Sequence, residues 1–131
     1  WQDNFGVAFQ EGYSGDRVFA FMAALTGMVM ASYDHKTAFY LTDRLDPQKL
    51  YNCARNIEVA VWKLSNAKLP NGNKALVTNS IEGDVQNLSF EREFGKIIAQ
   101  QDMLALIIED RSNRAITRAI QNAAAFRFLP I

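Results

Sequence analysis

The sequence predicts an all-α protein, a compact bundle of four main helices plus one or two short helices. Three observations favour this fold. Apolar residues recur at helical spacing over four long segments. Residues that commonly begin helices, such as Asp46 followed by Pro47, precede these segments. The dipeptide Asn71-Gly72 is not flanked by alternating apolar and polar runs, so no convincing β-hairpin is expected.

Length and composition suit one helical domain spanning residues 1–131. Hydrophobic residues make up 49% and charged residues 21% of the chain, which argues against disorder. The 14 basic and 14 acidic residues balance. Because phosphate binding needs a surplus of cations, this balance argues against a nucleic-acid partner.

The first predicted element is a short helix within residues 3–13, with Phe5, Ala8 and Phe9 on one face. Glycines at positions 12 and 15 are expected to end it. The second helix is expected to begin at Ser14 or Asp16 and to run to about Tyr33.

This second helix is apolar on every side, which predicts a place in the middle of the bundle. It also carries a stripe of small residues: Ala20, Ala24, Gly27 and Ala31. The stripe predicts close approach of another helix of the same chain. The alternative is self-association through the stripe, which would make a homodimer.

Residues 34–46 form a polar connection, interrupted by Phe39 and Tyr40, in which we expect a short helical turn. The third helix is expected over residues 47–66. Its apolar stripe consists of Leu50, Cys53, Ala54, Ile57, Ala60, Val61 and Leu64. Leu-Pro-Asn-Gly at 69–72 predicts a turn after that helix.

Residues 73–88 are expected to form a loop with at most one short turn of helix, because Gly83 and several asparagines interrupt them. A fourth helix is expected from about Ser89. The apolar run 103–108 within it leaves a buried strand as a competing interpretation. A last helix is predicted from Ser112 to about Ala125, followed by an apolar tail that docks on the bundle.

We expect seven residues to form the most inaccessible part of the core. They come from all four main predicted helices: Leu25, Val29, Ile57, Val61, Ile98, Leu104 and Ile120.

No set of residues with catalytic or metal-ligating spacing is evident. His35 is the only histidine, and we expect it to lie in a solvated loop. Cys53, the only cysteine, lies on an apolar stripe and is expected to be a small buried residue rather than a nucleophile. The sequence therefore predicts no catalytic residues, no metal site and no cofactor.

Two surface features are candidate binding sites. Tyr51, Arg55, Glu58 and Trp62 share one flank of the third helix, and these residue types are common at protein interfaces. An internal contact is the alternative for this flank. In the last predicted helix, three arginines at i, i+3 and i+7 are candidates for anion binding: Arg111, Arg114 and Arg118. An ordinary solvated helix face is the alternative there.

We therefore expect a non-enzymatic module that binds another protein, such as an inhibitor, an immunity-type factor or an adaptor. The alternatives are a small-ligand or lipid carrier with a cavity lined by methionines and phenylalanines, and an enzyme of unrecognised type. The uncharged stretch 18–33 is too short to span a membrane. The chain begins with Trp1, so trimming and removal of an export signal are both open, and so is the choice between periplasm and cytoplasm.

Overall fold

A computed structural model describes residues 1–40, 42–79, 81–82, 85–118 and 127–131. It confirms the all-α class. The helices are α1 (Gln2–Phe9), α2 (Arg17–Ser32), α3 (Pro47–Asn66) and α4 (Ser89–Ser112). A small hairpin, β1 (Ile81–Glu82) with β2 (Val85–Gln86), precedes α4 in the segment where the sequence predicted a loop with at most one short turn of helix. No helix in these ranges is long and apolar enough to cross a bilayer.

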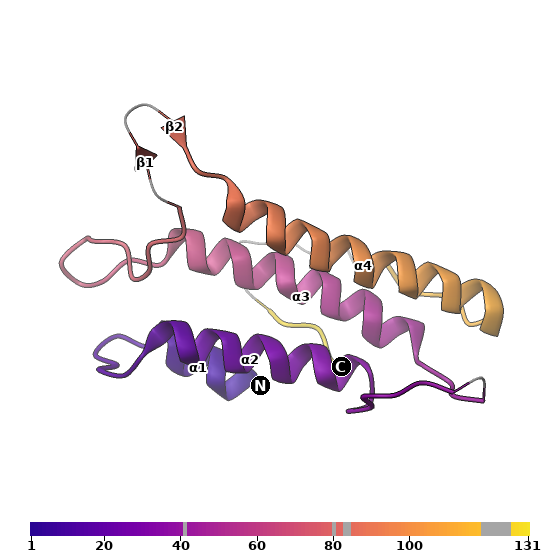
Figure 1. Ribbon diagram of the computed structural model, residues 1–131. Helices are drawn as coiled ribbons and strands as arrows, with labels where there is room; N and C mark the ends of the chain where they lie inside the picture. The colour runs from indigo at the N-terminus through magenta and orange to yellow at the C-terminus, as the bar shows by residue number, and fades with distance from the viewer. Residues whose placement is uncertain (41, 80, 83–84, 119–126) are drawn as a thin grey trace.

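The helices form layers with α3 in the centre. Figure 1 shows α3 between α4 on one side and the α1–α2 pair on the other, while the hairpin projects beyond the bundle. The most extensive contacts join α3 to α4 and α1 to α2. The amphipathic α3 thus occupies the central place that the sequence assigned to α2.

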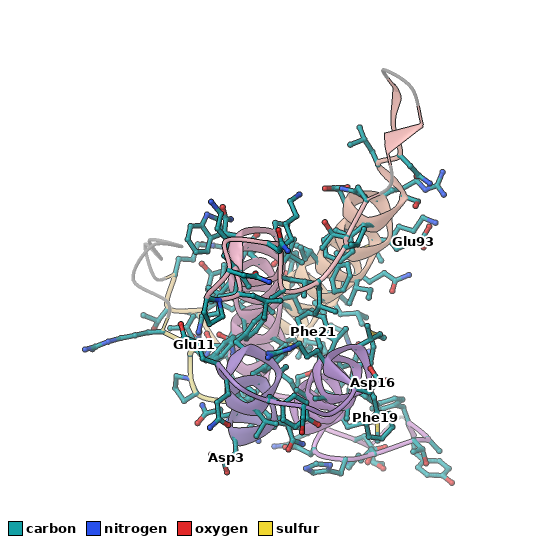
Figure 2. The ribbon with its side chains drawn as sticks, turned by 90° about the vertical axis from the view of Figure 1, so that its left-hand side faces the viewer. Asp3, Glu11, Asp16, Phe19, Phe21 and Glu93 are labelled. Atoms are coloured by element: carbon teal, nitrogen blue, oxygen red, sulfur yellow. The ribbon has the colours of Figure 1, made fainter. Side chains whose placement is uncertain are left out.

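The prediction that α2 is buried on every side is wrong. Val18, Phe19 and Met22 are exposed, and Phe19 has 72% of its surface accessible. Figure 2 shows Phe19 on the outer side of α2 near Asp16, whereas Phe21 points toward α4. The reason is that α1, α3 and α4 together contact only part of the circumference of α2.

The small-residue stripe of α2 is used inside the chain. Ala20 and Ala24 are buried in the same core cluster as Phe5 and Ala8 of α1. A Cβ atom placed on Gly27 would lie 3.5 Å from the Cβ of Trp1. The stripe therefore lets the N-terminal segment approach α2 closely, as expected for packing within one chain.

The starts of α2 and α3 follow the sequence signals. The Asp16 side chain accepts a hydrogen bond from the backbone N–H of Phe19 at 2.9 Å. The Asp46 side chain accepts one from the N–H of Gln48 at 2.9 Å, and Pro47 occupies the first turn. These caps satisfy amides that the helices cannot pair internally. Helix α1 is shorter than predicted, because it ends at Phe9 and the chain turns through Gly12 at φ +79°.

The connections also differ from expectation in part. Residues 34–40 and 42–46 contain hydrogen-bonded turns rather than a helical turn, with the N–H of Asp43 donating to the carbonyl of Tyr40. The predicted turn at 69–72 is confirmed: the N–H of Gly72 donates to the carbonyl of Leu69 at 2.8 Å. Residues 103–108 are helical, so the competing strand interpretation is wrong.

The helix predicted from Ser112 does not begin there. Helix α4 continues through Ser112 and ends at Asn113, which has a left-handed φ of 52°. Residues 114–118 have no regular secondary structure, and the remainder of the predicted helix, 119–125, lies outside the described residues. Side chains replace helical hydrogen bonds here: Glu109 accepts from the N–H of Ile116 at 2.8 Å, and Gln48 accepts from that of Thr117 at 2.7 Å.

Three carboxamides on one side of α3 hold the chain's C-terminal segments. Gln48 also donates to the carbonyl of Thr117 at 3.1 Å, and Asn52 donates to that of Pro130 at 2.7 Å. Asn56 both donates to the carbonyl of Leu129 at 2.9 Å and accepts from its N–H at 2.6 Å. These residues are spaced at i, i+4 and i+8, so they form one row along the helix. We call them the amide row.

The predicted docking of the tail is confirmed. The Phe128 ring stacks on Phe5 with ring centroids 5.1 Å apart and meets Trp1 edge-on at 5.5 Å. The tail thereby closes the core over α1 and α3.

The predicted core is correct in part. Leu25 and Ile57 are buried, whereas four other predicted core residues are only half-buried: Val29, Val61, Ile98 and Leu104. The seventh, Ile120, lies outside the described residues. The half-buried four sit at the margins of α2, α3 and α4, because each helix covers only a stripe of its neighbour.

Candidate functional site

The predicted flank of α3 is divided between an internal contact and the surface. Arg55 lies over the ring of Tyr51 at 5.2 Å, and its guanidinium contacts Asp102 of α4 at 2.6 Å. A second ion pair joins Arg55 to Glu58 at 3.1 Å. Arg55 and Tyr51 therefore help to join α3 to α4, which is the structural alternative that the sequence left open.

The other two flank residues remain at the surface. Trp62 is 37% exposed, and Glu58 is exposed as well. Partial burial raises the pKa of the Glu58 carboxyl, Arg55 opposes this shift, and Asp102 adds to it. A binding role for Glu58 and Trp62 stays a prediction.

The three predicted arginines do not share a helix face. Arg111 belongs to the last turn of α4, whereas Arg114 and Arg118 lie in the irregular segment beyond it. Arg118 pairs with Glu109 at 3.5 Å and turns toward α3. Only Arg111 and Arg114 line the same cavity.

That cavity is an open groove of about 1130 Å³ between the C-terminal half of α4 and the connection from α2 to α3. We call it the arginine groove, because Arg44 joins Arg111 and Arg114 in its wall. Its apolar lining comes from aromatic and aliphatic side chains on both elements: Tyr33, Phe39, Tyr40, Leu45, Leu104, Ile107 and Ile108.

Positive charge predominates in the lining of the groove. Among the described residues, Asp43 is the one carboxylate that lines it, and this side chain accepts hydrogen bonds from Lys36 at 2.6 Å and from the N–H of Tyr40 at 2.7 Å. These bonds lower the pKa of Asp43, with Lys36 contributing most. Arg44, Arg111 and Arg114 have no ion pair with any residue in the described ranges.

An exposed apolar ridge borders this groove. Met103, Leu106 and Ile107 of α4 are each about half exposed and lie at i, i+3 and i+4. We call them the α4 ridge. Ile107 lines the arginine groove, while Leu106 lines a smaller groove of about 310 Å³ on the α3 side, beside Arg55 and Arg118.

Sequence reasoning missed Arg44 and the α4 ridge as parts of a site. The aromatic pair Phe39 and Tyr40, within an otherwise polar connection, was the available signal for the groove. Both side chains are exposed at its edge. The ridge carried no separate signal, because its residues belong to the apolar run 103–108, which the sequence placed in the fourth helix with a buried strand as the alternative.

The described residues hold no cluster of three or more His, Cys, Asp or Glu side chains that could bind a metal. Cys53 is fully buried, as the sequence predicted, and burial raises the pKa of its thiol to about 11. His35 is exposed in a turn after α2, with a left-handed φ of 59°.

The arrangement can therefore offer two things to a partner: a half-exposed apolar ridge, and a groove in which aromatic side chains lie beside guanidinium groups that have no ion pair within the described part of the chain. Comparison of the chain with models of protein families, with curated proteins and with solved structures found no match.

Proposed function

We propose that the chain is a non-enzymatic protein-binding module and that its contact surface is the α4 ridge with the arginine groove. The observation that carries this proposal is the exposure of Met103, Leu106 and Ile107 on neighbouring positions of one helix. Apolar side chains gathered at one place on a surface are typical of a site that another molecule covers.

The composition around the ridge supports a protein as that molecule. Aromatic residues, methionine and arginine are enriched at protein interfaces. Here Met103 lies on the ridge, Phe39 and Tyr40 lie at the edge of the groove, and Arg111 of α4 lines the same groove. Burial of apolar surface contributes about 25 cal/mol per Å², so covering this area supplies a driving force for binding.

The core gives no comparable support for a carrier with a cavity between its helices. The phenylalanine rings that such a cavity would need are packed against one another. Phe21 meets Phe5 at 5.4 Å and Phe94 at 6.1 Å between ring centroids. Close ring contacts of this kind fill the space between helices rather than line a void.

Site-specific photocrosslinking in the native source tests the proposal. A photoreactive amino acid replaces Leu106 on the ridge. The matched control carries it at Val77, an exposed apolar residue in the connection between α3 and the hairpin. We expect one dominant protein to crosslink at position 106 and not at position 77.

The captured protein is then purified and its binding to the chain is measured directly. The variant Leu106→Asp should weaken that binding at least tenfold, and Val77→Asp should leave it unchanged. Equal crosslinking at both positions, or binding that Leu106→Asp does not alter, would count against the ridge as the contact surface.

A further inference from the structure

The arginine groove combines an apolar lining with guanidinium groups that nothing in the described residues neutralises. We infer that its partner is an acidic amphipathic protein segment, whose apolar side chains cover the α4 ridge and whose carboxylates pair with Arg44, Arg111 and Arg114. This inference rests on the proposed function and adds the chemistry of the partner.

The carboxylates and the arginines at this end of the bundle differ in how they are paired. Most carboxylates here are already engaged. Asp34 contacts Lys49 at 2.6 Å, Asp43 contacts Lys36, and Glu109 accepts from the N–H of Ile116. Asp110 is exposed but does not line the groove. These three carboxylates thus already have ion-pair or hydrogen-bond partners, whereas the groove arginines have no ion pair within the described residues.

Stabilisation of the C-terminus of α4 is the structural role that these arginines would have without a partner. A cation near the C-terminus of a helix is stabilising, because the last carbonyls carry partial negative charge. At the end of α4, however, the Ser112 hydroxyl donates to the carbonyl of Ile108 at 2.6 Å. Arg114 lies beyond the end of the helix, and Arg44 comes from a different connection. Stabilisation of the partial negative charge at the helix C-terminus therefore does not explain why Arg44 and Arg114 lie beside Arg111 in the groove.

The size and lining of the groove favour an elongated ligand over a small anion. An inorganic anion would use the guanidinium groups and leave the apolar lining uncovered. The groove, at about 1130 Å³, is larger than the roughly 300–1,000 Å³ typical of small-molecule sites. The ridge extends the apolar surface past it through Met103 and Leu106. An elongated segment with one apolar and one acidic side matches both parts, since arginine forms bidentate pairs with carboxylates.

A display selection with random 16-residue peptides tests this inference without knowledge of the partner. The bait is the purified chain, and the parallel bait is the double variant Arg111→Glu/Arg114→Glu. The control bait is Arg92→Glu/Lys96→Glu, which reverses two exposed charges near the other end of α4. Circular dichroism verifies that all three baits are folded.

We expect the wild-type and control baits to enrich peptides with apolar residues at helical spacing and several Asp or Glu residues. The double variant should lose these peptides, and the binding of a selected peptide in fluorescence anisotropy should weaken at least tenfold. Added salt should weaken the wild-type interaction as well, because exposed charge pairs are screened.

Three results would overturn the inference. Enriched peptides that bind the ridge but carry no acidic residues would leave the proposed function standing and refute the acidic partner. Failure to enrich any peptide, together with crosslinking at position 106, would have the same meaning. Sedimentation with vesicles containing phosphatidylglycerol that depends on Arg111 and Arg114, without peptide binding, would assign the groove to a membrane instead.

Discussion

The inner side of α3 carries polar side chains that are buried and hydrogen-bonded, whereas the outer side of α4 carries apolar side chains that are exposed. Along α3, buried polar side chains face the C-terminal segments, and Asn56 forms hydrogen bonds with both backbone groups of Leu129. Along the C-terminal half of α4, apolar side chains face outward, and Arg111, like Arg114 beyond the helix end, has no ion pair within the described residues. The polar groups of the first region are hydrogen-bonded within the chain, whereas the second region exposes apolar and cationic side chains that another molecule could contact.

The difference separates stability from binding. Removing a buried hydrogen-bonding group leaves its partners unpaired, which destabilises the fold. Replacing an exposed apolar group usually changes stability little. Substitutions in the amide row should therefore alter the free energy of unfolding, and substitutions in the α4 ridge should alter binding.

The largest expected effect is at Asn56. Replacing Asn56 by Ala removes two hydrogen bonds to Leu129 and leaves a gap at a fully buried position. We expect a loss of about 4 kcal/mol in the free energy of unfolding, because each unpaired buried group costs about 1–3 kcal/mol. Denaturant titration measures it. Asn52→Ala removes one bond to the tail and one bond from the side chain of Gln48. It should cost roughly half as much, because Gln48 is only half-buried and water can replace its lost partner; equal, small losses at both sites would show that the amide row does not hold the tail.

The next largest effect is a difference in the free energy of unfolding between truncations of two apolar residues that the sequence placed together in the core. Ile57 is fully buried in α3, whereas Leu104 is half-buried at the edge of the arginine groove. Ile57→Ala should cost about 3 kcal/mol, and Leu104→Ala about 1 kcal/mol, because only the first leaves an enclosed cavity. Thermal or denaturant unfolding of the two variants decides this, and equal losses would place Leu104 in a covered core.

The third prediction uses pH and concerns Cys53. Its thiol pKa is about 11 in the folded protein against an ordinary value of 9.0, so the folded state binds this proton more tightly than the unfolded state. Stability from this group is present below pH 9 and is lost as the pH rises toward 11. Each pKa unit is worth about 1.4 kcal/mol, which gives about 2–3 kcal/mol in all.

Other groups titrate over the same range, so the measurement is the difference between the wild type and Cys53→Ala. The free energy of unfolding should fall more steeply for the wild type than for the variant between pH 9 and 11. Parallel curves would mean that the thiol is accessible to water in the folded state.

Much of the fold could be predicted because local signals governed it. Asp46 and Pro47 begin α3 as their chemistry requires, and the apolar stripe through Ile57 faces the core. The error about α2 has a different origin. Its composition reports how apolar it is, but the exposure of Phe19 depends on how many neighbours surround the helix.

The site was less predictable, because it depends on contacts between distant segments. The structure has an irregular segment at 114–118 in place of the helix expected from Ser112, and Gln48, 69 residues away from Thr117, bonds to both of its backbone groups. The row of arginines was accordingly divided, and Arg44 took the place of Arg118 beside Arg111 and Arg114. No spacing along the sequence carries that information.

The most direct test of the account is the stability of a triple variant of the α4 ridge, Met103→Gln/Leu106→Gln/Ile107→Gln. Glutamine retains good helix propensity, so the change isolates the loss of apolar surface. Because these side chains are half exposed, we predict that denaturant unfolding stays cooperative and that the free energy of unfolding changes by no more than about 1 kcal/mol. A loss as large as that of Asn56→Ala would show that the ridge belongs to the core, and would contradict its assignment as a surface for a partner.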